Sequence, residues 1–410
     1  MFIKNKIKNF FSEKHTFFIL GSLFLLLIPN CVEVLSINFL YGLIYRGIIL
    51  TLFGIFCAMS FIFNKQYKIR NFTIFIFIYL AFSIISLCLT KVKPNLKLET
   101  LDYFMSLGEI GSTVISLIFI YSCFKSYEIN KQLIIKVLSY ASIVLIILSI
   151  FIDWNSIVNT FTKFDHSNYD VKSIFFDKNT FGIFLFASCI CFCYLGITNK
   201  RQYLIGALVC TIYSAVARVK TSLVISLIIL TITFIYCVIS DLKSKKIKNL
   251  FIYISLILFI LIFVILTLFK VGLFTKIYDV IFGDYGLIYD GKVVIRERFK
   301  NWSNKVGSVN SPLIWILGYG ERLAYTFAGR PIDNAYIYIL LNGGILKLIL
   351  YFLIIFMIIK FKINQTHSPV VRSISLISLF SVLIYGFLED FCLLGCSLHN
   401  LIFLLIVVCL

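Results

Sequence analysis

The chain has 410 residues, of which 60% are apolar and 14% are charged, and its mean hydropathy is +0.98. Soluble domains carry about 25% charged residues, so this composition excludes a water-soluble enzyme, a disordered scaffold and a secreted disulfide module. The 38 Lys and Arg residues against 19 Asp and Glu give a net charge of +19, which in a membrane protein encodes orientation and contact with anionic surfaces and makes nucleic acid a poor candidate partner.

Apolar runs of about 20 residues recur along the whole chain and predict an all-α polytopic membrane protein, because backbone that crosses lipid has to satisfy its hydrogen bonds within each helix. We expect about twelve transmembrane helices, near residues 17–32, 40–62, 72–90, 107–124, 133–152, 181–197, 203–217, 221–240, 250–269, 334–359, 373–388 and 392–409. The basic segment before the first run leads to no small-residue cleavage site, so we expect a retained span and not a removed signal peptide.

Lys and Arg in the short loops predict the side of the membrane on which each loop lies. If the N-terminus is cytoplasmic, every inner loop is basic, through Lys65, Lys68, Arg70, Lys125, Lys131, Lys200, Arg201, Lys243, Lys245, Lys246, Lys248, Lys360, Lys362 and Arg372. The outer loops at 33–39 and 389–391 contain no Lys or Arg. By the positive-inside rule both termini are then cytoplasmic. The chain forms one integral membrane domain, residues 1–410, with long outer loops at 153–180 and 270–332.

The outer loop at 270–332, between the ninth and tenth expected spans, carries the densest polar sequence. Arg296 and Arg298 suit a diphosphate, because guanidinium groups are planar forks of donors that stay charged; the alternative is a solvated amphipathic helix at the lipid headgroups. Gly318 and Gly320 predict either a plain tight turn or a close approach of the backbone to a ligand. Asp333, at the outer start of the tenth span, is either a helix cap or a base that acts on a hydroxyl.

Two further polar clusters are expected on the same outer face, one opening the sixth span at Asp177–Gly182 and one in the short turn at 218–222. Candidate helix N-caps in these clusters are Asn179, Thr180, Thr221 and Ser222. Their cations are also candidate interfacial anchors that extend toward the headgroups. Taken together, the clusters and the large loop gather cations on one membrane face and favour an anionic ligand there, bound by Lys178, Arg218, Lys220, Arg296 and Arg298.

Charges inside apolar runs indicate function by default, because ions are costly in lipid. Arg46 is near enough to the outer surface for its side chain to reach water, whereas the roles of Lys347 and His399 stay open. Most of the twelve cysteines lie inside apolar runs, where Cys behaves as a small hydrophobe. No Cys or His spacing typical of a metal site occurs, so no metal and no cofactor is predicted.

Five short motifs follow one another along the chain: Asn179-x-x-Gly182, Arg218-Val219-Lys220-Thr221-Ser222, Arg298-x-x-x-Trp302, Gly318-Tyr319-Gly320, and Asp333-Asn334-Ala335-Tyr336 with Gly343-Gly344 after it. In their order and their placement on one face they resemble those of the O-antigen polymerases (Wzy type), which share a superfamily with the O-antigen ligases. Ala217 stands where that family often has Ser. The resemblance covers residues 170–360 by motif and the whole chain by topology. It implies a GT-C-like glycosyltransferase of the bacterial inner membrane whose active site faces outward.

The resemblance also implies a reaction in lipopolysaccharide or capsule biosynthesis. A sugar hydroxyl of one undecaprenyl-diphosphate-linked oligosaccharide attacks the anomeric carbon of another, and undecaprenyl diphosphate leaves without the help of a metal. Catalytic roles would fall to Asp333, Arg298 and Arg218, with Asp333 orienting the acceptor hydroxyl. Substrate-binding roles would fall to Arg296, Lys178, Asn179, Lys220, Asn334, Tyr336, Gly318 and Gly320. A regulator of chain length is an expected partner.

Three other functions stay open on the sequence. An O-antigen ligase typically carries His before the motif Asn, so Asp333 favours a polymerase. A lipid-linked oligosaccharide flippase or other transporter would concentrate polar residues near the midplane, often in repeated halves, whereas here they crowd one interface. A membrane sensor would need an output domain, and no sequence for one remains outside the spans.

Overall fold

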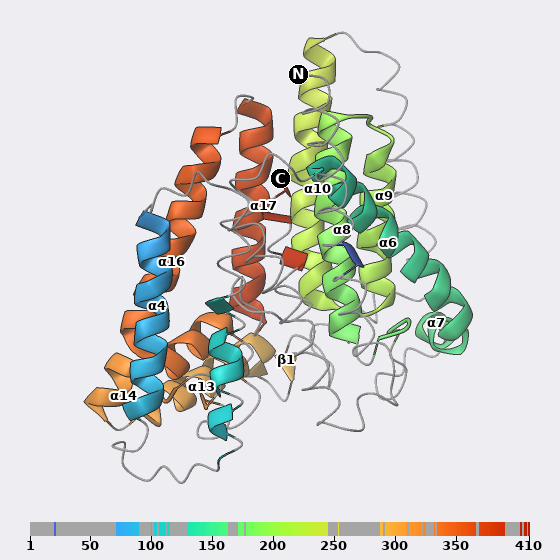
Figure 1. Cartoon of the computed structure of the whole chain (residues 1–410). Coiled ribbons are helices and arrows are strands. Elements are labelled where there is room, and N and C mark those ends of the chain that lie inside the picture. The colour runs from blue at the N-terminus through green and yellow to red at the C-terminus, as the bar shows by residue number, and fades with distance from the viewer. Residues whose placement is uncertain are drawn as a thin grey trace. The chain divides into compact units, whose positions relative to one another are not determined.

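Most of the chain that the structure describes is helical, as the apolar composition predicts (Figure 1). The computed structural model describes residues 71–89, 130–162, 171–175, 178–244, 292–309, 311–320, 334–365 and 369–389, parts of 100–114 and of 402–410, and residues 20–21, 253, 288–289, 323–324 and 332. Within these residues, five helices are long and apolar enough to cross a membrane: Lys131–Ile152, Lys178–Thr198, Lys220–Lys243, Ala335–Lys360 and Val371–Leu388. The chain is therefore a multi-pass membrane protein.

Seven of the expected spans correspond to helices of the structure. They are α4 (Asn71–Cys88), α6 (Lys131–Ile152), α8 (Lys178–Thr198), α9 (Tyr203–Val216), α10 (Lys220–Lys243), α16 (Ala335–Gln365) and α17 (Pro369–Leu388). The spans expected near 17–32, 40–62 and 250–269, and most of those near 107–124 and 392–409, lie outside the described residues, as do Arg46 and His399. The chain divides into two compact units, Leu138–Lys305 and Met1–Val137 with Val306–Leu410.

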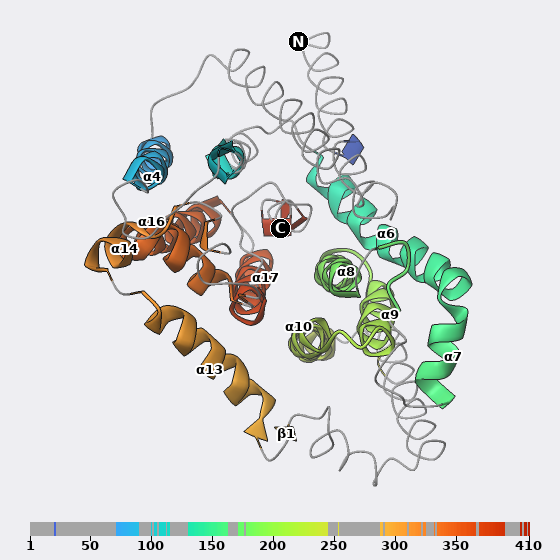
Figure 2. The same ribbon diagram turned by 90° about the horizontal axis from the view of Figure 1, so that it is seen from below.

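The unit formed by Leu138–Lys305 is built around α8, α9 and α10, which lie side by side when seen along their axes (Figure 2). Helix α8 is the central one, because every residue from Thr180 to Cys193 is buried. At one end of these helices, Arg201 donates to both carboxylate oxygens of Asp241, at 2.8 and 3.0 Å, and to the carbonyl of Gly196 at 2.6 Å. The end of α8, the start of α9 and the end of α10 are thus tied together.

The same unit contains shorter elements within the two segments that the sequence predicts to be long outer loops. Helix α7 (Trp154–Thr162) follows α6, and β1 (Ile288–Tyr289) pairs with β2 (Lys292–Val293) in an antiparallel hairpin that leads into α13 (Val294–Gly307). Part of the expected outer loop at 270–332 is therefore folded into regular structure.

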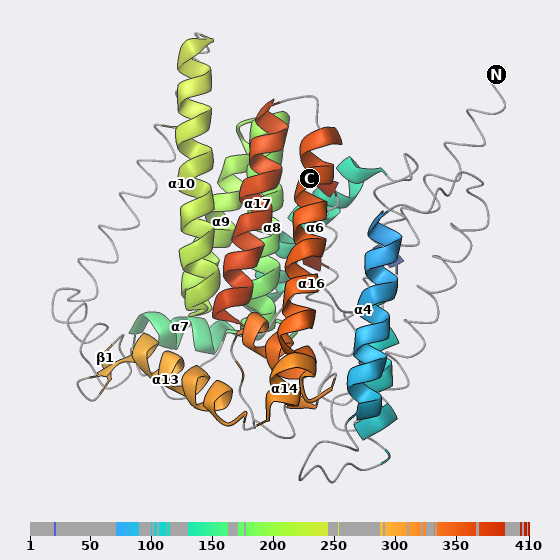
Figure 3. The same ribbon diagram turned by 90° about the vertical axis from the view of Figure 1, so that its left-hand side faces the viewer.

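The second unit contains α4, α16 and α17 together with α14 (Pro312–Leu317), a short helix of the expected loop at 270–332. Helix α16 contacts each of the other three, and Figure 3 shows α14 beside its lower part. Helix α16 is interrupted at Gly344, where φ is 69° and ψ is −175°. The apolar core of this region joins α4, α14 and α16 through Leu87, Ile110, Val309, Ile314, Tyr319, Leu323, Ala324, Ile332 and Leu341.

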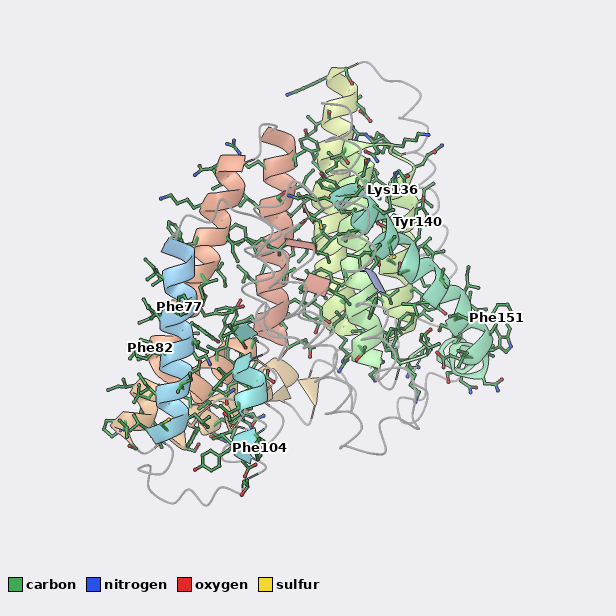
Figure 4. All side chains as sticks on the ribbon, viewed as in Figure 1. Phe77, Phe82, Phe104, Lys136, Tyr140 and Phe151 are labelled. Atoms are coloured by element: carbon green, nitrogen blue, oxygen red, sulfur yellow. The ribbon has the colours of Figure 1, made fainter. Side chains whose placement is uncertain are left out.

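Large apolar side chains cover the outward faces of these helices. Phe77, Phe104 and Phe151 are 65%, 68% and 78% exposed and are labelled in Figure 4. Soluble monomers rarely expose contiguous apolar patches of this kind. Such faces fit contact with lipid, in agreement with the assignment of membrane spans.

Candidate functional site

The starts of α8 and α10 meet closely at one end of the unit Leu138–Lys305. A Cβ atom added to Gly182 would lie 2.4 Å from Cγ1 of Val219 and 2.8 Å from Oγ of Ser222. Only glycine therefore fits where the first turns of α8 cross the turn between α9 and α10. The structure thus brings residues 178–182 close to residues 218–222. We call these two segments together the mouth.

Cations and helix N-termini share the mouth. Lys178 and Arg218 are half-buried there, while Asn179 and Lys220 are exposed. Helices α8 and α10 both begin here, and the N-cap of α10, Val219, makes no side-chain capping bond. Because the first amides of a helix carry partial positive charge, they add to the ammonium and guanidinium groups. Three cations and the N-termini of two helices therefore lie at the mouth, an arrangement that suits an anion.

The expected N-caps at the mouth differ from those in the structure. Helix α8 begins at Lys178 and α10 at Lys220, so the four candidates lie inside first turns and not at cap positions: Asn179, Thr180, Thr221 and Ser222. The N-cap position of α10 is held by Val219, which has no polar side chain to cap the helix.

Arg218 occupies an unusual backbone position in that reversal. The amide of Val219 donates to the carbonyl of Ser214 at 3.1 Å, and the amide of Arg218 donates to the carbonyl of Ala215 at 3.0 Å. These two bonds form a Schellman motif, which places Arg218 at the position after the C-cap where Gly is usual. Arg218 accordingly has φ of 58°, in the left-handed region that costs an L-residue roughly 1–2 kcal/mol.

The sequence analysis missed Asp153, which orders the segment before α8. Its Oδ2 accepts the amides of Lys172 at 3.0 Å and of Ser173 at 2.6 Å. The hydroxyl of Ser173 in turn donates to the carbonyl of Leu145 in α6 at 2.8 Å. Asp153 thus anchors the segment just before Lys178, and an acidic residue directly after an apolar span was the available sequence signal.

In the second unit, Gly318 and Gly320 make the close backbone approach that their sequence allowed, and the partner is α16. The amide of Tyr319 donates to the carbonyl of Leu341 at 2.7 Å, and the amide of Gly320 donates to that of Asn342 at 2.9 Å. A Cβ atom on Gly318, which has φ of 69°, would lie 2.3 Å from the carbonyl of Asn342. Burial raises the pKa of the Tyr319 phenol above its usual range.

Asn334 and Tyr336 join the start of α16 to the end of α17. The side-chain oxygen of Asn334 accepts the amides of Tyr336 at 2.9 Å and Ile337 at 3.0 Å, which is an N-cap. Its Nδ2 donates to the carbonyl of Phe387 at 3.0 Å, and the hydroxyl of Tyr336 donates to that of Leu383 at 2.6 Å. The cap of α16 is thus Asn334, and its neighbour Asp333 lies outside the described residues.

Arg296 and Arg298 belong to α13, so the expected helix is present, although their side chains lie outside what the structure describes. Trp302, one turn after Arg298, is 6% exposed and meets the ring of Phe299 edge-on at 4.9 Å. Within the described residues, no group of three or more His, Cys, Asp or Glu side chains is placed to hold a metal ion.

Comparisons of this chain with protein families, with curated proteins and with solved structures find no match. The resemblance to the O-antigen polymerases therefore rests on the sequence motifs.

Proposed function

We propose that this protein is a polysaccharide repeat-unit polymerase, a metal-independent glycosyltransferase of the bacterial inner membrane with cytoplasmic termini and about twelve spans. It transfers the glycan of one undecaprenyl-diphosphate-linked oligosaccharide to a sugar hydroxyl of another. The observation that supports this proposal best is the mouth, where Lys178, Arg218 and Lys220 lie at the N-termini of two packed helices.

The proposed reaction needs cations at the step in which the diphosphate leaves. The bond between the anomeric carbon and the diphosphate oxygen breaks as the acceptor oxygen bonds to that carbon, and the diphosphate leaves with the bonding electrons. Fixed donors aimed at the charge that develops on a leaving group are usually the largest catalytic contribution. In this proposal Arg298 and Arg218, assisted by Arg296, stabilise the diphosphate, and Asp333 accepts the proton of the acceptor hydroxyl.

The substrate-binding residues of the proposal divide into two groups. Lys178, Asn179 and Lys220 present exposed or half-buried side chains at the mouth and contact the donor directly. The other group has hydrogen bonds or backbone contacts within its own unit, which hold the segments on either side of Asp333 in place: Gly318, Gly320, Asn334 and Tyr336.

One observation favours a second candidate, a transporter of lipid-linked glycans. Discontinuous membrane helices such as α16 are typical of transporters, in which the break lines the substrate site. In α16, however, the outer segment 316–320 occupies the break, since a Cβ atom on Gly344 would lie 2.1 Å from the carbonyl oxygen of Ile316.

Deletion of the gene, followed by electrophoresis of surface polysaccharide, separates these functions. A polymerase predicts loss of the ladder of chain lengths while a single attached repeat unit persists. A ligase predicts no attached repeat, and a transporter predicts lipid-linked repeat units trapped on the cytoplasmic side. Complementation with Arg298→Ala or Asp333→Ala should fail to restore the ladder at normal membrane levels, and restoration by both would overturn the site assignment.

A further inference from the structure

Lys347 is a buried cation in the middle of a membrane helix. Its side chain is 2% exposed and lies in α16, close after the interruption at Gly344. Burying an ammonium group carries a large desolvation cost, and charges inside membrane spans indicate function by default.

The Lys347 side chain links the break in α16 to α4. A Cβ atom on Gly343 would lie 1.9 Å from Cδ of Lys347, so the aliphatic stem fills the space that this glycine leaves free. The ammonium nitrogen lies 4.6 Å from the centroid of the Tyr79 ring in α4. This distance is that of a cation–π interaction, which strengthens when both groups are shielded from water.

Three contacts link α16, α4 and the outer segment 316–320 in a closed ring. We call this set of contacts the clasp. Lys347 on Tyr79 joins α16 to α4, and Ser86 of α4 donates its hydroxyl to the carbonyl of Leu317. The amides of Tyr319 and Gly320 complete the ring by donating to the carbonyls that the break in α16 leaves free. Figure 3 shows the three elements, α4, α14 and α16, that supply these contacts.

The clasp also reaches the helix that carries Arg296 and Arg298. Nε1 of Trp315 in α14 donates to the carbonyl of Val309 at 3.2 Å, and the amide of Val309 donates to the last turn of α13 at Val306. The docked segment therefore fixes the C-terminal end of α13.

We propose that Lys347 and Tyr79 are positioning residues that keep the outer segment docked in the break of α16 and so hold the C-terminal end of α13, the helix whose sequence carries Arg296 and Arg298, in place for diphosphate departure. This proposal rests on the proposed function. Because Lys347→Met keeps an unbranched stem in the space beside Gly343, removal of the charge should cost activity more than folding.

The test compares Lys347→Met, which keeps the stem and removes the charge, with Lys347→Arg, which keeps a cation over the ring. Lys360→Met, at an exposed lysine of the same helix, is the matched control. With purified lipid-linked repeat units, Lys347→Met should lower kcat about tenfold or more, with KM within about threefold of wild type. Lys347→Arg and Lys360→Met should stay near wild type, and the midpoint of thermal unfolding of Lys347→Met should stay within about 4 °C of wild type.

Tyr79 supplies the other half of the test. Tyr79→Phe keeps the ring face and should be active, whereas Tyr79→Leu should resemble Lys347→Met. Because one contact is removed in each case, the variant carrying both Lys347→Met and Tyr79→Leu should be no worse than either single variant.

Amide hydrogen exchange at residues 318–320 measures whether the outer segment is docked in α16, and this measurement does not depend on enzymatic activity. In Lys347→Met the amides of Tyr319 and Gly320 should exchange faster than in wild type. Unchanged exchange overturns the clasp, and faster exchange with wild-type kcat overturns the positioning role. If the wild-type protein makes no polymer, the proposed function fails, and the exchange measurement still decides whether Lys347 holds the segment.

Discussion

Arg218 combines a charged side chain with a backbone conformation that favours glycine. The Schellman motif after α9 requires a left-handed residue, and the chain supplies Arg there with φ of 58°. Backbone strain of this kind concentrates at functional sites, where the side chain matters more than the conformational cost.

This position separates stability from activity. Arg218→Gly removes the backbone strain of the folded state, but it also increases the conformational entropy of the unfolded chain. Because the two effects oppose each other, we expect the free energy of unfolding to stay within about 1 kcal/mol of wild type. Polymerisation should be lost, because the guanidinium at the mouth is gone. Thermal unfolding in detergent and electrophoresis of the polysaccharide measure the two effects.

Arg218→Lys is the matched control, since it keeps the charge and the strain but loses the planar fork. We expect partial activity from it. A ladder of normal intensity with Arg218→Gly would show that the guanidinium plays no part in the reaction.

At the scale of elements, the mouth depends on how closely α8 crosses the turn before α10. Gly182 has no room for a methyl group, whereas Gly111, also helical, has nothing within 4 Å of an added Cβ atom. The two glycines therefore offer the same substitution in opposite environments.

Gly182→Ala should lower the free energy of unfolding by about 1–3 kcal/mol through overpacking and should reduce polymer length by separating Lys178 from Arg218. Gly111→Ala should raise the free energy of unfolding by up to about 1 kcal/mol, because Ala favours helix over Gly. Thermal unfolding of both variants measures the difference. A stabilised Gly182→Ala variant would contradict the close crossing.

The elements also show which features the sequence predicts and which it does not. Helix α8 follows from its unbroken apolar run, and its ends were expected within a few residues. The break in α16 has a local signal in Gly343 and Gly344, but its partners, Gly318 and Tyr79, come from distant parts of the chain and only tertiary packing selects them. The start of α10, expected at residue 221, lies at Lys220.

At the scale of the whole molecule, the number of membrane crossings depends on α9. This helix has 14 residues, fewer than the usual span of about 20. Its two ends nevertheless lie at opposite ends of the unit, since Arg201 contacts Asp241 at one end and Val219 meets Gly182 at the other. Helix α9 therefore runs alongside the segment of α8 from Gly182 to Gly196.

We expect α8, α9 and α10 each to cross the membrane, from an outer loop before α8 to a basic inner loop after α10. Alkaline phosphatase, which is active only outside the cytoplasm, should be active when fused after Thr162 and inactive when fused after Lys243. Activity at both positions would mean that α9 does not cross and that the orientation of every later loop is reversed.

The docking of Gly318 and Tyr319 into α16 has a consequence for biogenesis. In the proposed orientation residues 316–320 lie outside and precede α16 in the chain, so they would pass the translocon before the ribosome delivers the helix that receives them. The carbonyls of Leu341 and Asn342 thus meet waiting donors as α16 enters the bilayer, and no backbone oxygen has to face hydrocarbon alone. The order in which the two segments are synthesised thus suits the break in α16, whose hydrogen-bond donors are made first.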